Sequence, residues 1–417
     1  MKKVFRRSLA AGMLVALTVA ISLHGQEIKL GNQAVQVHGF GTQGLIYTND
    51  NNWLTMNTSA GSVKFTDVGL NLGSQISRKV RAAAQGYDRS LGQLGKWHPQ
   101  FDFYMLDVRP KPWLGFRGGK VKTVLGLYTD TQDMDFDHTF ALLPQSIYPI
   151  DMRDSSIAHV GGDIYGTERL AHNLGSLTYT AYGGHRSDSK YSGYPYLLTN
   201  IAPGVHIYLT SYSGPVYGGD LRWNTPVPGL TVGVSRQNED ISGVGTLSIP
   251  AAGVSGVPYN EKSFQDWTNW FYGKYTKNRL HIEAEDKRYY QAKDIFSSTA
   301  WFYADTRGWY VSGGFRINKW LEAGSYYSHY RIFIGGADLV ANGPALNFNY
   351  TDPQKRDNDK VVTAKITFNQ YVTLKVEGHF MAGNGLATYP DGFYTSVNPL
   401  GLADNTNALI VRTGFNF

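Results

Sequence analysis

The chain contains no cysteine, and only 17 % of its 417 residues are charged. The absence of cysteine is consistent with export, and it excludes catalysis by a thiol nucleophile. After the N-terminal segment no apolar run reaches about 18 residues, so transmembrane helices are excluded. No repeat of fixed period is present, which disfavours a propeller or a solenoid. The chain also lacks a Gly-x-Ser-x-Gly motif and the paired histidine spacing of a zinc site.

Residues 1–25 have the pattern of a secretory signal, with a basic start followed by an apolar core from Leu9 to Leu23. The basic residues are Lys2, Lys3, Arg6 and Arg7. Cleavage is expected after Ser22 or after Gly25. An uncleaved anchor is less favoured, because the apolar stretch is short for a membrane span. The mature domain is therefore expected to cover 26–417.

Loss of that segment changes the charge of the protein. The whole chain carries 39 basic and 33 acidic residues, for a net charge of +6. Without the four basic residues of 1–25, 35 basic residues face 33 acidic ones, a net charge of +2. This near-balance gives no support for nucleic-acid binding, which needs a concentrated basic face. No cofactor is predicted.

The mature chain is rich in glycine and aromatic residues, with 47 Gly, 28 Tyr, 20 Phe and 9 Trp in the full sequence. The mean hydropathy is nevertheless negative, at −0.30. Alternating membrane strands produce this combination, because their inward polar residues offset the outward apolar ones. The last ten residues, 408–417, illustrate the pattern. Leu409, Val411, Phe415 and Phe417 alternate with Ala408, Arg412, Gly414 and Asn416.

A period of two residues predicts an all-β chain of about sixteen strands. The expected strands are 35–48, 62–78, 80–91, 100–109, 114–123, 156–166, 175–186, 214–224, 229–240, 262–277, 279–291, 305–317, 320–333, 357–368, 371–382 and 407–417.

The connections between these strands alternate between short and long. Short turns such as 277–278, 318–319 and 369–370 alternate with long polar segments. The main long segments are 49–61, 124–155, 187–213, 241–261, 334–356 and 383–406. Outer-membrane barrels typically alternate in this way, because every second connection is a short periplasmic turn and the others are long extracellular loops. Aromatic residues beside the short turns, as expected for an interfacial ring, are Trp113, Trp223, Trp320 and Tyr371.

Several stretches resemble a porin-like family of Gram-negative outer-membrane β-barrel proteins of the general diffusion type. They are 119–123, 126–128, 131–133, 141–149, 374–379 and 411–417. The resemblance implies a sixteen-stranded transmembrane antiparallel barrel, often trimeric, whose third long loop folds into the pore. Here that loop is 124–155, counted after 49–61 and 92–99. It would supply the constriction residues Asp130, Asp133, Asp135, Asp137 and His138.

The opposing wall of the pore would supply basic residues. By strand parity, we expect the following side chains to point inward: Arg81, Arg222, Arg316, Lys365, Lys375 and Arg412. Lys120 and Lys122 share parity with Leu114 and would face lipid. A bulge at Gly118–Gly119 would reverse the face and turn both lysines inward. Acidic and basic groups on opposite walls would set up a transverse field. The small net charge predicts weak ion selectivity.

Two other site chemistries are less favoured. Asp133, Asp135 and Asp137 imitate the start of a calcium loop, but the glycine and glutamate that complete such a loop are missing. The row 281–287 is interpreted as a polar inner wall rather than a metal or acid–base site. No metal site is therefore predicted, and no catalytic residue is assigned.

The predicted function is an outer-membrane porin, a water-filled channel for passive diffusion of small hydrophilic solutes and ions. A substrate-selective channel for an anion, phosphate or sugar is the alternative. An adhesin or structural barrel, or a membrane-embedded hydrolase, is less favoured. Expected partners are outer-membrane lipid, lipopolysaccharide, the barrel-assembly machinery and two further copies of the chain. Phe415 and Phe417 are the expected assembly signal.

Overall fold

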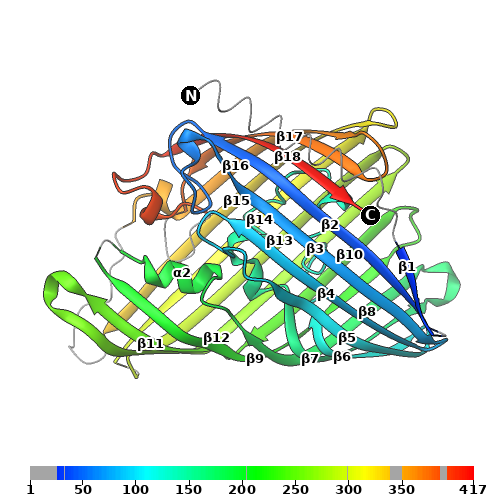
Figure 1. Cartoon of the computed structure of the whole chain (residues 1–417), viewed down its shortest axis with the longest axis horizontal. Helices are drawn as coiled ribbons and strands as arrows, with labels where there is room; N and C mark the ends of the chain where they lie inside the picture. The colour runs from blue at the N-terminus through cyan, green and yellow to red at the C-terminus, as the bar shows by residue number, and fades with distance from the viewer. Residues whose placement is uncertain (1–25, 32, 203, 298, 339–349, 386–391) are drawn as a thin grey trace.

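The structure is a computed structural model that describes residues 26–31, 33–202, 204–297, 299–338, 350–385 and 392–417. The predicted signal segment, 1–25, lies outside the described residues. The described chain forms a single antiparallel sheet that closes on itself into a tilted barrel (Figure 1). Its strands are β1 (Gln26–Leu30), β2 (Gln33–Thr48), β3 (Ser62–Ser77), β4 (Val80–Leu91), β5 (Gln100–Lys111), β6 (Leu114–Lys122), β7 (Ala158–Arg169), β8 (Ser176–Ser187), β9 (His206–Asn224), β10 (Leu230–Glu239), β11 (Ser242–Ile249), β12 (Val254–Lys277), β13 (Leu280–Ile295), β14 (Ala300–Arg316), β15 (Leu321–Asp338), β16 (Arg356–Thr367), β17 (Val372–Gly383) and β18 (Asn405–Asn416).

The barrel wall contains sixteen strand positions. β1 is a short strand that pairs only with the start of β2. β10 and β11 follow one another between the same two neighbours, β9 and β12, so together they occupy one position. All sixteen predicted strands are present, most with ends within a few residues of the prediction. The prediction of a transmembrane-type antiparallel barrel of about sixteen strands is confirmed.

The prediction was wrong about the length of two strands and missed a third. Segments 187–213 and 241–261 were expected to be loops, but β9 begins at His206, β12 begins at Val254, and β11 lies between β10 and β12. These extensions pair with one another beyond the rest of the wall, at the left of Figure 1. They were missed because β11 is rich in glycine and serine and has weak strand propensity.

The barrel closes between its first long strand and its last. β18 pairs with β2 from Ala408 opposite Thr48 to Asn416 opposite Phe40. The amide of Phe417 donates to the Gly39 carbonyl at 2.9 Å, and that of Gly39 donates to the Phe417 carbonyl at 3.1 Å. The Phe417 ring covers Gly39 so closely that a Cβ there would lie 2.4 Å from it. Glycine at this position therefore lets the terminal aromatic pack across the closing pair of strands.

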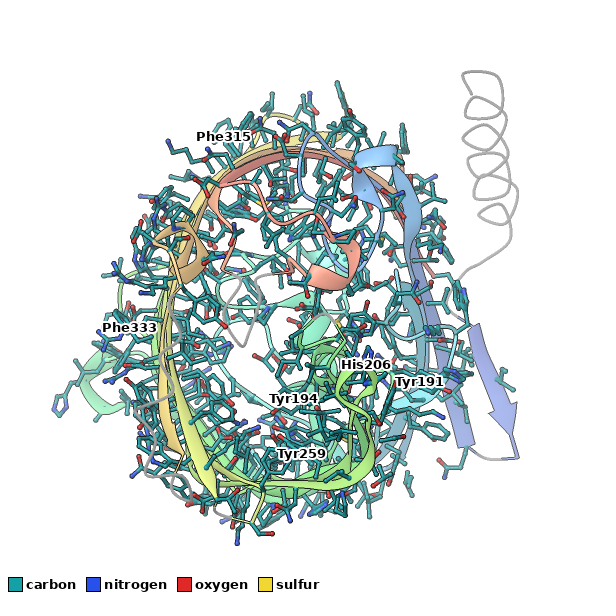
Figure 2. All side chains as sticks on the ribbon, turned by 90° about the vertical axis from the view of Figure 1, so that its left-hand side faces the viewer. Tyr191, Tyr194, His206, Tyr259, Phe315 and Phe333 are labelled. Atoms are coloured by element: carbon teal, nitrogen blue, oxygen red, sulfur yellow. The ribbon has the colours of Figure 1, made fainter. Side chains whose placement is uncertain are left out.

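The polarity of the two faces of the wall is the reverse of that in a water-soluble barrel. Outward side chains are large, apolar and exposed, as at Val311 (49 %), Phe315 (48 %) and Leu409 (46 %). Inward neighbours on the same strands include buried polar groups such as Ser312 and Arg412. Figure 2, which views the barrel from the long-loop end, places Phe315 and Phe333 on the outside and Tyr194 within. An apolar exterior around a polar interior is the arrangement of a membrane-spanning barrel.

Short connections gather at one end of the barrel and long ones at the other. Residues 278–279, 317–320 and 368–371 join neighbouring strands by tight turns. The predicted ring of aromatics beside these turns is exposed at Trp113 (42 %) and Trp320 (54 %). At the opposite end lie the long loops and the helix α2 (Gly193–Thr199). Among the described residues no helix is long and apolar enough to cross a membrane.

Candidate functional site

The bore of the barrel is occupied by the segment 123–157, called here the inward loop, which connects β6 to β7. It contains two short helical turns, Asp135–Asp137 and Ile150–Ser155. Its backbone bonds to strands on opposite sides of the bore. Arg222 of β9 donates to the Gly126 carbonyl at 3.1 Å, and Arg412 of β18 donates to the Ala141 carbonyl at 2.7 Å. The prediction that the third long loop folds into the barrel is confirmed.

The first carboxylate that holds this loop is Asp133. Its oxygens lie 2.8 and 3.0 Å from Lys122 Nζ, 2.5 Å from the Gln85 amide and 3.7 Å from Arg153. Burial raises the pKa of the Asp133 carboxyl, but Lys122 and Arg153 outweigh burial and leave it below its ordinary value. Arg153 itself is fixed by Asp102 of β5. The loop is thereby attached to β5 and β6 by ion pairs and to β4 by the hydrogen bond from Gln85.

The second anchoring carboxylate is Asp135. It lies 2.9 Å from Lys375 Nζ and 3.3 Å from the Arg412 guanidinium. Lys375 is fully buried, and it also donates to the Phe140 carbonyl at 2.9 Å. Burial raises the pKa of the Asp135 carboxyl, and the cations Lys375 and Arg412 bring it below the ordinary value. Buried charges of this kind need their partners, because each loses its hydration.

His138 is held inside the loop rather than exposed to the bore. Its Nε2 lies 3.0 Å from the Thr131 carbonyl, and its ring meets that of Tyr128 edge-on at 4.8 Å. Burial, and then the nearby charge of Lys375, lower the pKa of His138 to about 4. The imidazole is therefore neutral at physiological pH.

Asp137 is exposed on the same helical turn as Asp135. Burial raises the pKa of Asp130, which lies half-buried in the loop.

Most of the predicted basic wall contacts the inward loop directly. Lys122, Lys375 and Arg412 pair with loop carboxylates, as described above. Lys365 donates to the Phe136 carbonyl at 2.6 Å. Arg316 is largely exposed and lies 3.8 Å from Glu322, whereas Arg81 lines a cavity near the short-turn end. The structure thus brings three basic residues against acidic ones at contact distance, rather than across an open gap.

Lys120 and Lys122 differ from the geometry expected for them. No residue is inserted at Gly118–Gly119, because β6 stays in register with Leu106, Met105 and Tyr104 of β5. The predicted bulge is therefore absent. The backbone instead changes direction at Gly119, where φ is +129°. Lys122 reaches Asp133 inside the barrel, while Lys120 Nζ donates to the Phe101 carbonyl at 2.6 Å.

Two inward glutamates also hold the inward loop. Glu285 lies in the row 281–287 that the sequence predicts as a polar inner wall, whereas the sequence reasoning did not single out Glu377. Glu285 accepts from the Tyr148 and Tyr310 hydroxyls at 2.7 Å and from the Leu127 amide at 3.0 Å. Glu377 accepts from the amides of 141 and 142 at 2.8 and 3.0 Å. The sequence could have indicated these contacts, because a carboxylate at an inward position in the middle of a strand needs hydrogen-bond donors inside the barrel.

One side of the bore, called here the packed side, consists of β16 to β18 and β2 to β4 and is filled by apolar side chains. Residues of the loops 49–61, 92–99 and 392–404 fold inward and meet inward residues of these strands. The cluster comprises Ile46, Trp53, Leu54, Met56, Phe65, Leu91, Leu94, Ala141, Leu142, Met381, Phe393, Ala408 and Ile410. These residues are almost completely buried, so the part of this side that the cluster fills excludes water.

The other side of the bore, called here the cavity side, consists of β8 to β15 and retains a cavity of about 140 Å³ beside the inward loop. Polar and aromatic groups line it together. They include Tyr212, Gln237, Trp270, Lys287, Tyr289, Thr306 and Tyr330. A second cavity, of about 410 Å³, lies on the other side, against β2 to β5 nearer the short-turn end, and touches the inward loop at Met134 and Phe136. The loop therefore has open space on two sides.

A closed sixteen-stranded barrel with an apolar exterior and an inward loop is the fold of the outer-membrane porins. The structure is similar to OmpT of Vibrio cholerae (TM-score 0.55, 10 % identity, 94 % of this chain and 100 % of that one). It is also similar to the outer-membrane channel DcaP of Acinetobacter baumannii (TM-score 0.52, 11 % identity, 95 % and 100 %). An anion-selective porin from Comamonas acidovorans matches at a TM-score of 0.53 and 8 % identity, over 93 % and 100 %. No family model and no curated relative matches the sequence.

Proposed function

We propose that this protein is an outer-membrane porin through which small hydrophilic solutes and ions diffuse passively. The observation that carries the proposal is the polar and aromatic cavity beside an inward loop within a closed, externally apolar barrel. A packed soluble barrel would fill this space with side chains, whereas a diffusion channel needs it open to water. The inward loop then sets the width of the path, and its buried ion pairs keep it in place.

The proposal extends to processing and assembly. Residues 1–25 are removed on export, and the mature domain begins at 23 or 26. Short turns face the periplasm, and long loops face the exterior. The barrel-assembly machinery recognises the C-terminal strand with Phe415 and Phe417. Three copies assemble in the membrane; an in-vitro folded OmpT of Vibrio cholerae with the same fold is described as a trimer form. We assign no catalytic activity and no cofactor to the barrel.

The proposed site roles follow from the contacts. Asp133 and Asp135 hold the inward loop against Lys122, Lys375 and Arg412. The charged groups that bias the passage of ions are those nearer open space. They are Asp130, Asp137, Arg81, Lys120, Arg222, Arg316 and Lys365. Because so many charges neutralise one another at contact distance, the channel discriminates weakly between anions and cations.

A substrate-selective channel is the second candidate, and one observation favours it. Trp270, Tyr289 and Tyr330 border the cavity together with Gln237 and Lys287. Aromatic faces beside hydrogen-bonding groups suit a solute with apolar and polar faces, such as a sugar.

Planar-bilayer recording distinguishes the two candidates. A diffusion channel gives ohmic single-channel steps that do not saturate as any one solute is raised. A selective channel gives a current that a particular sugar or anion blocks with a saturable dependence on its concentration. Absence of conductance from correctly folded protein would contradict both.

A further inference from the structure

Five arginines lie on the outer face of the barrel, almost all directly opposite one another on neighbouring strands. The strand registers pair Arg288 with Arg307, Arg307 with Arg331, and Arg331 with Arg356. On the other side, Arg288 pairs with Asn269, and Asn269 pairs with Arg236. The row therefore crosses six neighbouring strands, from β10 to β16. We call Arg236, Asn269, Arg288, Arg307, Arg331 and Arg356 the arginine row.

Neighbouring residues establish that the row faces outward. Residues two positions away on the same strands are exposed, as at Val234 (39 %), Trp309 (38 %) and Phe333 (41 %). The intervening residues, such as Ser235 and Tyr330, are buried within the barrel. Figure 2 also places Phe333 on the outside of the wall. The side chains of Arg288 and Arg307 are 44 % and 53 % exposed.

Directly opposed like charges on one face of a sheet repel one another. Asp305 compensates part of this repulsion, at 2.9 Å from Arg288 and 3.0 Å from Arg307, and Asp352 lies 2.7 Å from Arg356. Asp286 also lies on this face, opposite Trp309. Among the described residues, however, Arg236 and Arg331 form no ion pair within 4 Å. The row thus retains cationic groups for an external anion.

The depth of the row limits what that anion is. Arg236 lies six residues from the short-turn end of β10, and Arg356 lies eleven residues from that end of β16. With a rise of about 3.3 Å per residue and a tilt of about 40°, the row climbs from roughly 15 to roughly 28 Å above the short turns. The apolar band of such barrels is about 25 Å tall. The row thus runs through the leaflet on the long-loop side and ends at its surface.

Aromatic rings hold the guanidinium groups in place. Arg236 and Arg288 lie 5.0 and 5.3 Å from the Trp267 ring. Arg307 and Arg331 lie 5.4 and 5.1 Å from the Phe333 ring. Such cation–π contacts limit the movement of the side chains. Asn238 and Asn269 accept three bonds from Arg236, and Asp305 accepts two from Arg288, which leaves the other N–H groups of these side chains available. Planar forks with fixed orientation match the oxygen atoms of a phosphate group.

We propose that the arginine row binds the phosphate groups of a phosphorylated glycolipid in the outer leaflet. Charge complementarity favours this occupant, because lipid phosphates are the anions at the edge of the apolar band, where the Arg356 end of the row lies. Five arginines distributed over six strands suit a head group with more than one phosphate. The lipid acyl chains then lie against exposed apolar residues nearer the short turns, such as Phe271 and Val311. This site is separate from the bore and does not depend on channel activity.

Native mass spectrometry of the detergent-solubilised full barrel tests the proposal, with diphosphoryl lipid A as the probe. The test variant combines Arg288→Gln, Arg307→Gln and Arg331→Gln. The matched control combines Arg78→Gln, Arg169→Gln and Arg279→Gln, which removes three exposed arginines from the short-turn end. We expect lipid binding to weaken roughly tenfold or more in the test variant, from the loss of charge-assisted bonds, and to stay unchanged in the control. A heat-dependent shift on gel electrophoresis checks that both variants are folded.

Each further outcome decides for or against the site. Fully dephosphorylated lipid should bind much more weakly than diphosphoryl lipid A, and inorganic phosphate at millimolar concentration should not displace the lipid. Displacement by inorganic phosphate would identify a free-phosphate site instead. Equal lipid binding by the test variant and the wild type would overturn the proposal. A change in the number of copies per particle with unchanged lipid binding would identify the row as a contact between copies, which would also overturn it.

Discussion

At the level of the apolar cluster, the packed side of the bore excludes water, whereas the cavity side of the same barrel leaves open space. On the packed side, inward positions such as Ile46, Phe65 and Ile410 are apolar, and loops fold in to cover them. On the cavity side, inward positions such as Gln237, Lys287 and Thr306 are polar and border open space. The difference shows that the path through the barrel is set by which strands carry apolar inward residues, and not by the barrel diameter alone.

The inward loop joins the two sides and is fixed differently on each. Against the packed side it uses the buried charges of Asp135, Lys375 and Arg412. Against the cavity side it uses hydroxyl bonds, such as that from Tyr148 to Glu285. Removing one partner of a buried ion pair costs about 3–5 kcal/mol, more than the roughly 1.5–3 kcal/mol of a hydrogen bond to a charged group. The position of the loop therefore depends most strongly on the packed side.

The largest effect is expected from Asp135→Ala. The change leaves Lys375 buried and deprives Arg412 of a partner, which costs about 3–5 kcal/mol. We expect the inward loop to leave the packed side, so that single-channel conductance rises severalfold and becomes noisy. Asp137→Ala, at an exposed carboxylate on the same helical turn, is the control: it removes a charge that biases the passage of ions but leaves the loop in place, so conductance should change little and stay free of noise. Equal behaviour of the two variants would refute the anchoring role of Asp135.

A smaller effect is expected from Tyr289→Ala on the cavity side. Tyr289 lines the cavity, and removal of its ring widens the path without releasing the loop. Conductance should rise by less than twofold, roughly in line with the added cross-section, and larger neutral solutes should enter. Tyr290→Ala is the matched control, because this neighbour on β13 lies in register with Trp267 and Asp305 on the outer face. An equal rise in conductance in Tyr290→Ala and Tyr289→Ala would contradict the assignment of Tyr289 to the inner face and Tyr290 to the outer face.

A still smaller effect is expected from pH. The pKa of His138 is about 4 in the packed loop, against an ordinary value of about 6.5. Below pH 6.5 a released loop binds the proton more readily than the packed loop, so packing weakens progressively between pH 6.5 and 4. Asp133 and Asp135 have lowered pKa values, so their ion pairs persist through this window and are lost only at lower pH.

The pH effect is measured as current noise in planar bilayers, with His138→Asn as the control. Asparagine keeps a donor for the Thr131 carbonyl but does not titrate. The groups around His138 include Lys375, Asp135 and Glu283, and they are the same in both proteins. Noise should increase from pH 6.5 to 4 in the wild type and stay flat in His138→Asn. The same increase in both would assign the pH response to another group.

The smallest effect is the ion selectivity of the unmodified channel. The mature net charge is only +2, and the central carboxylates are neutralised by cations at contact distance. We therefore expect a reversal potential close to zero in a salt gradient. A strongly anion- or cation-selective reversal potential would show that groups on the cavity side dominate the field.

Much of the fold could be predicted because membrane strands carry a simple period of two. Residues 362–368 and 372–380 alternate so regularly that their strands and faces follow directly. The extensions of β9 and β12 could not be predicted, because beyond the membrane no apolar face is required. The contact of Lys122 with Asp133, at the end of β6, is one that parity does not reveal.

The site was only partly predictable, for a physical reason. Strand parity correctly brought Lys375 and Arg412 into the bore, and the family resemblance singled out Asp133 and Asp135. The partner of each charge depends on the path of the inward loop, which many weak contacts decide together. The sequence predicted charges that face one another across a gap, whereas the structure has ion pairs at 2.8 to 3.3 Å. The apolar loop residues Trp53, Leu54 and Met56 fill the packed side in a way that composition does not indicate.

Single-channel conductance in the presence of neutral polymers of increasing size tests the account most directly. We predict stable channels whose conductance falls when small polymers enter the bore and recovers above a size cut-off, with the cut-off raised in Asp135→Ala. A folded barrel that conducts no ions, or a conductance unaffected by polymers of every size, would contradict a water-filled path on the cavity side.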